Sequence, residues 1–376
     1  MLLRVFLGTA LLAGALSHPL STPNIQVRQT DDDVHYYDEA CNIGYCSIYG
    51  ATIGGWGGNY TNVTTLEQLT TAVTGSESIV VVVQGAITGN ATIQVGSSKS
   101  IIGSPGSSLS GLNLSLNGSR NIIFRNLNIT APVPITIQSG RSIWIDHCSL
   151  SSSSSSSINT LLSITAGSDY LTISNNIFSS PSHQTSPPRS NAVQIGNPTG
   201  PAVEPTEKPH ITLIGNVFFG VNTGITITTG TTHILNSLFQ HSATGVNAIS
   251  SAAAGGAAGG EGEGEGGGVA GGVLVESTIF EDVSQPLVVT NSNGTTTTTA
   301  GGGRVSIGQN VTTTKNGGGN VTTSTLPPRL GDLSGDNLPY PYDDYVLDLE
   351  GVRREGKLAG PTLRFAPAAA AGLGRR

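Results

Sequence analysis

The sequence contains few charged and few aromatic residues. Only 11% of its 376 residues are charged and 5% are aromatic, whereas about 25% of an average soluble domain is charged. The net charge of -7 excludes a nucleic-acid-binding protein that depends on a basic patch. A single methionine and sparse charged helix formers argue against a mainly helical protein. The sequence is instead rich in Ser, Thr, Asn and Gly, with 51 glycines, which indicates a β-rich protein with many turns.

Long hydrophobic runs are also missing. The apolar run at 5–16 is shorter than the roughly 18 residues that a transmembrane helix requires. It follows a basic start and precedes small residues, so we predict a secretory signal peptide over 1–17 rather than a buried N-terminal strand. We therefore expect a secreted, extracellular protein that does not bind nucleic acid or membranes and is a monomer.

The remaining chain is predicted to form one domain. Residues 18–40 are polar and acidic, and we interpret them as a lead-in or pro-segment. The domain is expected over 41–360, interrupted by a flexible Gly/Ala/Glu insertion at 252–272 that has no means of burying a core. Residues 361–376 are predicted to be a disordered tail.

If the protein is secreted, its cysteines can form a disulfide and its Asn-X-Ser/Thr motifs can be glycosylated. In an oxidising compartment the spacing of Cys41 and Cys46 permits a local disulfide, and Cys148 is then expected to be a buried free thiol. Nine Asn-X-Ser/Thr motifs are predicted acceptors of N-linked glycans. They are Asn59, Asn62, Asn90, Asn113, Asn117, Asn128, Asn293, Asn310 and Asn320.

A repeated pattern carries the prediction of the fold. Six stretches each consist of a β-branched run, a small or polar pair and a final apolar residue, at 124–129, 145–150, 173–178, 213–218, 234–239 and 275–280. Stacked coils explain this repeat, because one coil cannot bury its own apolar face and neighbouring coils together form a continuous core. Asparagine recurs where the strand should bend, since it tolerates the left-handed conformation and its amide can bond to the next coil. We predict an all-β, right-handed, single-stranded parallel β-helix. A β-sandwich is the alternative, but hairpin signals are few.

Several ordered motifs resemble those of the secreted pectate lyases and pectin lyases, in particular the fungal branch. The resemblance covers about 41–360. It is sharpest at Ser-Ile-Trp-Ile-Asp-His, residues 142–147, which is similar to the family's signature strand. Other matching segments are at 41–46, 54–58, 63–69, 79–89, 99–103, 168–176, 243–247, 273–277 and 338–342.

The resemblance implies β-elimination on a galacturonan, with Ca²⁺ as cofactor and an arginine as the base that removes the C5 proton. Carried over residue by residue, the family's calcium ligands fall on Val133, Asn159 and Ser163, and the catalytic arginine falls on Gly224. The substrate-binding lysine falls near Asn191. Calcium favours six to eight oxygen ligands that include carboxylates, so Ca²⁺ is implied by the resemblance only and these positions predict no metal site.

Basic residues are scarce around the expected groove. No Arg or Lys occurs from 209 to 303, so a shifted alignment does not supply the base. Six basic and six acidic residues cancel over 41–250, which predicts a neutral groove, whereas a polyanion favours a basic one. Arg189 is the remaining candidate for the base. His183 and Arg189 are the candidates for substrate binding.

The other polar residues are interpreted as structural. Asp146 and His147 are neighbours on a strand and should point to opposite faces, so we predict structural support and no catalytic dyad. Arg125 and Arg141 are predicted to be isolated cations on the surface of the solenoid. Trp56 either stacks on a sugar or packs under the N-terminal cap.

Two further histidines, His210 and His233, are each expected to open a strand and to bond neighbouring backbone; with Cys148 they do not have zinc spacing.

Two classes of function remain open at this stage. The first is a polysaccharide lyase of pectate or pectin lyase type that cleaves galacturonan. The second is a catalytically degenerate relative that binds pectic or other cell-wall polysaccharide, or is a surface glycoprotein, without cutting it. Formation of the unsaturated product separates the two classes.

Overall fold

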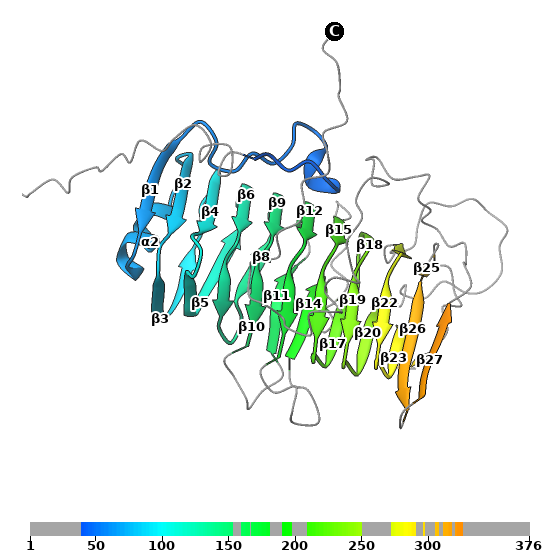
Figure 1. Ribbon diagram of the computed structural model, residues 1–376. Helices are drawn as coiled ribbons and strands as arrows, with labels where there is room; N and C mark the ends of the chain where they lie inside the picture. Colours follow the sequence, from blue (N-terminus) through cyan, green and yellow to red (C-terminus); the bar gives the residue numbers. More distant parts are fainter. Residues whose placement is uncertain are drawn as a thin grey trace, which may run out of the picture.

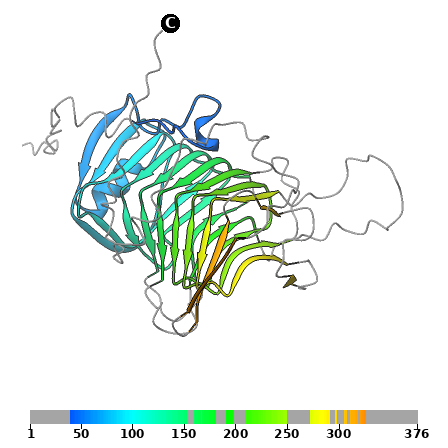
Figure 2. The same ribbon diagram turned by 45° about the vertical axis from the view of Figure 1, so that its right-hand side comes forward.

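The protein is a parallel β-helix, as the repeat predicts (Figure 1). The computed structural model describes residues 39–152, 159–165, 167–180, 190–197, 209–249, 272–290, 296–297, 305–307, 311–317 and 320–325. Successive coils stack along one axis and give the solenoid three faces (Figure 2). Within the described ranges, no helix is long and apolar enough to cross a membrane.

The first face is a parallel sheet of ten strands. In order they are β1 (Asn59–Val63), β2 (Ile79–Val83), β4 (Lys99–Gly103), β6 (Arg120–Arg125), β9 (Arg141–Asp146), β12 (Asp169–Ser174), β15 (His210–Ile214), β18 (Thr231–Leu235), β21 (Val273–Glu276) and β25 (Val305–Ile307). The signature motif therefore covers most of β9, in the middle of this face, and its last residue, His147, follows the strand.

The second face consists of short strands that directly follow those of the first. They are β7 (Asn128–Thr130), β10 (Ser149–Ser151), β13 (Ile177–Ser179), β16 (Val217–Phe219), β19 (Leu238–Gln240), β22 (Ile279–Glu281) and β26 (Thr312–Gly317). Strand β27 (Asn320–Thr325) pairs antiparallel with β26.

The third face completes each coil. Its parallel strands are β3 (Ala86–Gln94), β5 (Ser108–Asn117), β8 (Ile135–Gln138), β11 (Asn159–Ile164), β14 (Ser190–Ile195), β17 (Thr223–Ile227), β20 (Thr244–Ile249) and β23 (Gln285–Thr290). Strand β24 (Thr296–Thr297) pairs antiparallel with β23.

The core confirms the six predicted repeats. Their final residues align across neighbouring strands and form one buried column, Ile129, Leu150, Phe178, Phe218, Phe239 and Phe280. The four phenylalanine rings stack nearly parallel, with successive centroids 5.1, 4.3 and 4.8 Å apart. Such stacked aromatic residues bury a large apolar area in every coil.

The corner between the first and second faces explains the recurrent asparagines. Asn126, Asn175 and Asn236 have left-handed backbone, with φ of 54°, 56° and 48°. Asn176 Nδ2 donates to Asn216 Oδ1 of the next coil at 3.1 Å, as predicted. These amides satisfy polar groups that the bend would otherwise bury without partners.

The N-terminal segment lies across the first face. The Cys41–Cys46 disulfide is confirmed, and the short helix η1 (Tyr45–Ser47) sits on strands β12 and β15. Cys46 N donates to Thr172 Oγ1 at 3.1 Å, and Tyr45 N donates to Thr212 Oγ1 at 3.2 Å. The helix α2 (Leu66–Val73) packs against β1, β2 and β3 with Leu69 and Val73 buried.

Several predictions concern residues outside the described ranges. These are the signal peptide, most of the lead-in and of the insertion at 252–272, the tail, the segment 338–342, the sequons at Asn293 and Asn310, and the candidates His183 and Arg189.

Candidate functional site: the uncharged third face

Two rows of polar side chains run along the exterior of the third face. In β11 and β14 these side chains are half-buried and two consecutive buried residues separate the rows, whereas in β17 Thr226 is itself buried, with 8% exposure. The hydrogen-bond register aligns the first row as Thr136, Ser163, Gln194, Thr226 and Asn247. It aligns the second row as Thr160, Asn191, Thr223 and Thr244. Hydroxyl and amide groups of this kind can donate to and accept from the hydroxyls of a sugar chain.

The family's functional positions fall on this face or beside it, but their side chains differ from what the family chemistry requires. Asn159 and Ser163 lie on β11, Asn191 lies on β14, and Val133 lies just before β8. The carbonyl of Val133 accepts from Asn113 Nδ2 at 2.7 Å. Val133, Asn159 and Ser163 therefore present an aliphatic group, an amide and a hydroxyl in place of carboxylates.

These residues do not fit a calcium ion. Ca²⁺ is a hard cation that is bound largely through carboxylate oxygens. Among the residues that the structure describes, no three His, Cys, Asp or Glu side chains gather into a group that could hold a metal. We derive no chemical step through calcium at this face.

Gly224 is enclosed by the core, which explains why no larger residue stands there. A Cβ at this position would lie 2.4 Å from Cε1 of Phe239 and 2.6 Å from the carbonyl oxygen of Gly245. Both distances are far below any real Cβ contact. The backbone at Gly224 therefore cannot present an arginine to the exterior without moving.

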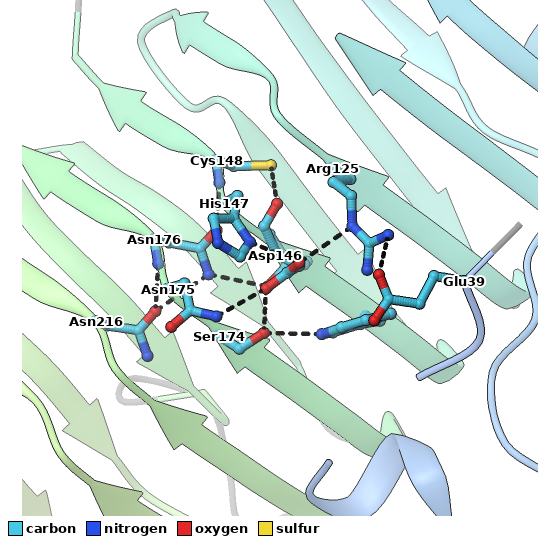
Figure 3. Close-up of polar contacts among 11 residues, drawn as sticks. Glu39, Arg125, Asp146, His147, Cys148, Ser174, Asn175, Asn176 and Asn216 are labelled. Carbon is cyan, nitrogen blue, oxygen red and sulfur yellow. Dashed lines mark hydrogen bonds and ion pairs between the residues drawn. The ribbon is translucent and has the colours of Figure 1, made fainter. Parts of the chain in front are cut away.

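The charged side chains gather on the first face instead. Asp146, at the end of β9, is buried among donors from three coils (Figure 3). Its Oδ2 accepts from Arg125 Nε at 3.1 Å and lies 2.7 Å from His147 Nδ1. Its Oδ1 accepts from Ser174 Oγ at 2.6 Å and from Asn175 Nδ2 at 3.2 Å. Charge-assisted hydrogen bonds of this number can hold a buried carboxylate in its ionised form.

The pKa of Asp146 reflects this environment. Burial alone would raise it, but the hydrogen bond and charge of His147, with further help from Arg125 and Ser174, lower it below the ordinary 3.8. The carboxylate is therefore ionised throughout the physiological range. Trp144 extends the network, because its Nε1 donates to Ser174 Oγ at 2.8 Å.

Two sequence-based interpretations of this cluster were wrong. His147 does not point away from Asp146, because its φ of 52° turns the chain at the corner and ends the alternation of the strand. Arg125 is not a surface cation, since it is only 4% exposed. It stacks over Trp144 at 4.3 Å and pairs with Glu39 at 3.0 Å. Glu39 belongs to the predicted lead-in, so this end of that segment contacts the solenoid.

The structural interpretation of the cluster is nevertheless supported. Arg125 lies one coil from Asp146, and it pairs with both Asp146 and Glu39 of the N-terminal segment. The spacing of the repeats could have predicted the contact between Arg125 and Asp146. Phe124 and Ile145 occupy equivalent places in neighbouring coils, so the residues that follow them must also be neighbours. The next residue, Cys148, is buried and free as predicted, and burial raises its pKa to about 12, which leaves it without thiolate character.

Both histidines contact carboxylates, whereas the prediction gave them backbone partners; His210 opens β15 as predicted. His210 Nδ1 lies 2.8 Å from Asp169 Oδ1, and the fully buried His233 lies inside β18 with Nε2 3.0 Å from Glu276 Oε2. The imidazole of His210 also stacks on the ring of Tyr170.

Arg141, which was predicted to be an isolated surface cation, also contacts Tyr170. The Arg141 guanidinium lies 4.6 Å from the centre of the Tyr170 ring and 4.0 Å from Asp169. The Arg141 side chain is 37% exposed and lies at the surface as predicted, but these contacts show that it is not isolated. Trp56 is 54% exposed, so it does not pack under the cap, and stacking on a sugar remains a prediction.

Comparison with known proteins agrees with this architecture. A family model described as "Pectate lyase" matches residues 34–328. The chain is 35% identical over 219 residues to a probable pectate lyase B of Aspergillus terreus, covering 56% of this chain and 65% of that protein. It is 32% identical over 268 residues to pectate lyase B of Colletotrichum gloeosporioides, covering 68% of this chain and 72% of that protein. The chain thus spans just under two thirds of the length of the Aspergillus relative.

Solved structures show the same fold. A pectate lyase from Bacillus sp. N165, in complex with trigalacturonate, has a TM-score of 0.57 at 19% identity, covering 84% of this chain and 97% of that one. The major cedar pollen allergen Jun a 1 has a TM-score of 0.51 at 18% identity, covering 69% and 76%. The chain and these structures thus share the parallel β-helix fold. The extent of the family match places the chain in the pectate lyase family.

Proposed function

We propose that this protein is a secreted, pectate-lyase-type polysaccharide lyase that acts on galacturonan of the plant cell wall. The observation that carries the proposal is the family match over residues 34–328, on a solenoid whose third face carries rows of hydroxyl and amide side chains. The names of the relatives support the substrate class. The apolar N-terminal run supports secretion.

The reaction would be a β-elimination. A base removes the proton from C5 of a uronate, the electron pair forms the C4–C5 double bond, and the bond from C4 to the glycosidic oxygen breaks. The departing oxygen then takes up a proton. A positioned base typically contributes about 10² to 10⁴ in rate.

Arg189 is the residue that we propose for this base. It directly precedes Ser190, the first residue of β14, which lies in the middle of the third face. His183 comes from the same connection, and we propose it for substrate binding. The strands of the third face from β8 to β23 contain no residue that could replace Arg189 as a base.

Binding of glycan without cleavage is the second candidate. The enclosed Gly224, at the family's catalytic position, favours it, because the face can hold a sugar chain while lacking the family's base. In this case the protein would bind cell-wall polysaccharide and leave it intact.

The ultraviolet absorbance of the unsaturated product separates the two candidates. The full-length secreted protein is incubated with polygalacturonate and with methyl-esterified pectin, each with Ca²⁺ and with a chelator, beside an active family member. An increase in absorbance that Arg189→Ala abolishes supports the lyase and its base. No increase, together with retention of the protein in a glycan-containing gel, supports binding without cleavage.

A further inference from the structure

Two arginines lie side by side at one corner of the solenoid. The structure describes the side chains of four basic residues, Lys99, Arg120, Arg125 and Arg141. Lys99 and Arg125 are buried, whereas Arg120 is exposed and Arg141 is half-buried. Arg120 begins β6 and Arg141 begins β9, and the register pairs them directly across the two strands. Each follows a two-residue turn from a third-face strand, so they lie at the corner between the third and first faces.

This corner has a net positive charge. Like charges directly opposite on neighbouring strands repel each other. The carboxylate at this end of the next strand is Asp169, whose Oδ2 lies 4.0 Å from Arg141 Nη1. It is buried, and its Oδ1 already accepts from the backbone N–H groups of Tyr170 and His210, each at 2.9 Å. No carboxylate of the described residues pairs with Arg120. An anionic ligand would therefore relieve the repulsion.

Aromatic rings adjoin the two arginines. The Arg141 guanidinium lies over Tyr170, 4.6 Å from the ring centre. Tyr49 of the N-terminal segment packs edge-on against Tyr170, with centroids 5.2 Å apart, and is 84% exposed. A tyrosine ring presents an apolar face beside a polar hydroxyl, which suits the C–H face and the hydroxyls of a sugar ring. A sugar that carries a carboxylate could stack on Tyr49 and pair with an arginine at the same time.

Both tyrosines have a costly backbone conformation. Their φ values are 52° at Tyr49 and 57° at Tyr170, in the left-handed region that bulky residues rarely adopt. The equivalent corner residue of β6 is Asn121, with φ of 58°, and asparagine tolerates this region. The turn itself therefore does not require a tyrosine at 170. Backbone strain of this kind clusters at ligand-binding positions.

His210 extends the corner by one coil. Its imidazole stacks on Tyr170 with centroids 5.6 Å apart and is half-buried. The carboxylate of Asp169 accepts and cannot donate, so the hydrogen bond at 2.8 Å places the imidazole proton on Nδ1. Nε2 makes no hydrogen bond to the described residues. It can accept from a sugar hydroxyl in the neutral imidazole and donate to a carboxylate in the protonated one.

We propose that this corner is a second binding site, which takes an acidic polysaccharide of uronate residues. The corner site consists of Tyr49, Arg120, Arg141, Tyr170 and His210. The strands β6, β9, β12 and β15 are neighbours (Figure 1), so at about 4.8 Å per strand the site extends about 14 Å along the solenoid. None of its residues belongs to a third-face strand. The inference goes beyond the proposed function, because holding a chain here requires no base.

Affinity electrophoresis of the full-length protein in gels that contain polygalacturonate and a chelator tests the site. We expect the double variant Arg120→Gln with Arg141→Gln to bind at least about tenfold more weakly than the natural protein. Lysines at both positions should retain more of the affinity, because they keep the charge. Added salt should weaken binding, since exposed charges are screened. A gel that contains a neutral glucan should not retard the protein.

The contribution of the aromatic ring has its own matched pair. Tyr49→Ala should weaken binding several-fold, whereas Tyr60→Ala should not, because Tyr60 is an exposed tyrosine on β1, outside the corner site. Unfolding midpoints show which variants fold. Arg120→Gln alone, at an exposed side chain, tests the site if the double variant does not fold.

Several results would overturn the corner site. These are unchanged binding by the folded arginine variants, equal effects of the two tyrosine substitutions, equal retardation by the neutral glucan, or no binding of polygalacturonate. Release of unsaturated product is measured in parallel with Ca²⁺ added. Cleavage together with unchanged binding by the arginine variants overturns the corner site and leaves the proposed lyase intact. Binding that depends on the arginines without any cleavage overturns the lyase and supports the corner site.

Discussion

Arg125 Nε donates to Asp146 Oδ2 at 3.1 Å from the neighbouring strand, although the two residues are 21 positions apart in the sequence. Both side chains are at most 5% exposed. A buried pair of this kind is destabilising when one partner is removed, because the other charge stays buried without compensation.

Asp146→Ala should therefore lower the free energy of unfolding by about 3–5 kcal/mol. Denaturation in urea, followed by tryptophan fluorescence, measures the loss, since Trp144 lies inside the same network. Glu67→Ala on the exposed side of α2 is the control, and a surface change of this kind should stay within about 0.5 kcal/mol. Equal effects of the two substitutions would contradict the role assigned to Asp146.

The pH dependence of stability follows from the lowered pKa of Asp146. In the unfolded chain this carboxyl titrates near 3.8, and in the folded protein below that value. Its contribution is thus complete above the unfolded pKa and is lost as the pH falls through the folded pKa. The difference in unfolding free energy between the natural protein and Asp146→Asn should be constant near neutral pH and shrink below about pH 4. A difference that grows on acidification would contradict the sign of this shift.

Sequence alone predicted the coils well because their core is periodic. The column from Ile129 to Phe280 was visible as the last residue of each repeat, and its register followed directly. The burial of Arg125 was missed because its partners come from another coil and from Glu39, which precedes the first repeat. His147 was misjudged because alternation was extended one residue beyond the end of the strand, into a left-handed corner.

The low charge of the third face could be predicted from the sequence, but the packing around its residues could not. The scarcity of charge was evident from the sequence, and Gly224 was identified at the family's catalytic position. That a side chain there would collide with Phe239 depends on how neighbouring coils pack, which no local pattern specifies.

Restoring an arginine at Gly224 should therefore fail for steric reasons. Gly224→Arg is expected to destabilise the protein by about 3 kcal/mol or more, as overpacking of a close-packed core does in severe cases. Thr223→Arg, one position earlier and on the exterior row, should change stability by about 0.5 kcal/mol at most. Thermal unfolding of both variants checks this, and a stable Gly224→Arg protein would show that the coil can open at this point.

The phenylalanine column offers a test of the core. Phe218 stacks between Phe178 and Phe239, and it is completely buried. Phe218→Ala should cost about 3–5 kcal/mol through lost burial and the remaining cavity. Phe218→Leu keeps most of the volume and should lose considerably less. Equal losses for both substitutions, measured by chemical denaturation, would contradict the tight packing.

Glycan occupancy should follow exposure and hydrogen bonding. Asn59, Asn62 and Asn90 are exposed on β1 and β3, whereas Asn113 Nδ2, the atom that would carry a glycan, donates to Val133 O. We predict glycans at the first three and an unmodified Asn113 in protein secreted from a fungal host. Mass spectrometry of the glycopeptides measures the occupancy, and the reverse pattern would refute this ranking.

The location of a bound substrate tests the central claim most directly. A crystal structure of the protein with a galacturonan oligomer should show the sugar chain across β11, β14 and β17, with Gln194 and Asn191 in hydrogen-bond contact. An oligomer seated only on the charged first face would contradict the account.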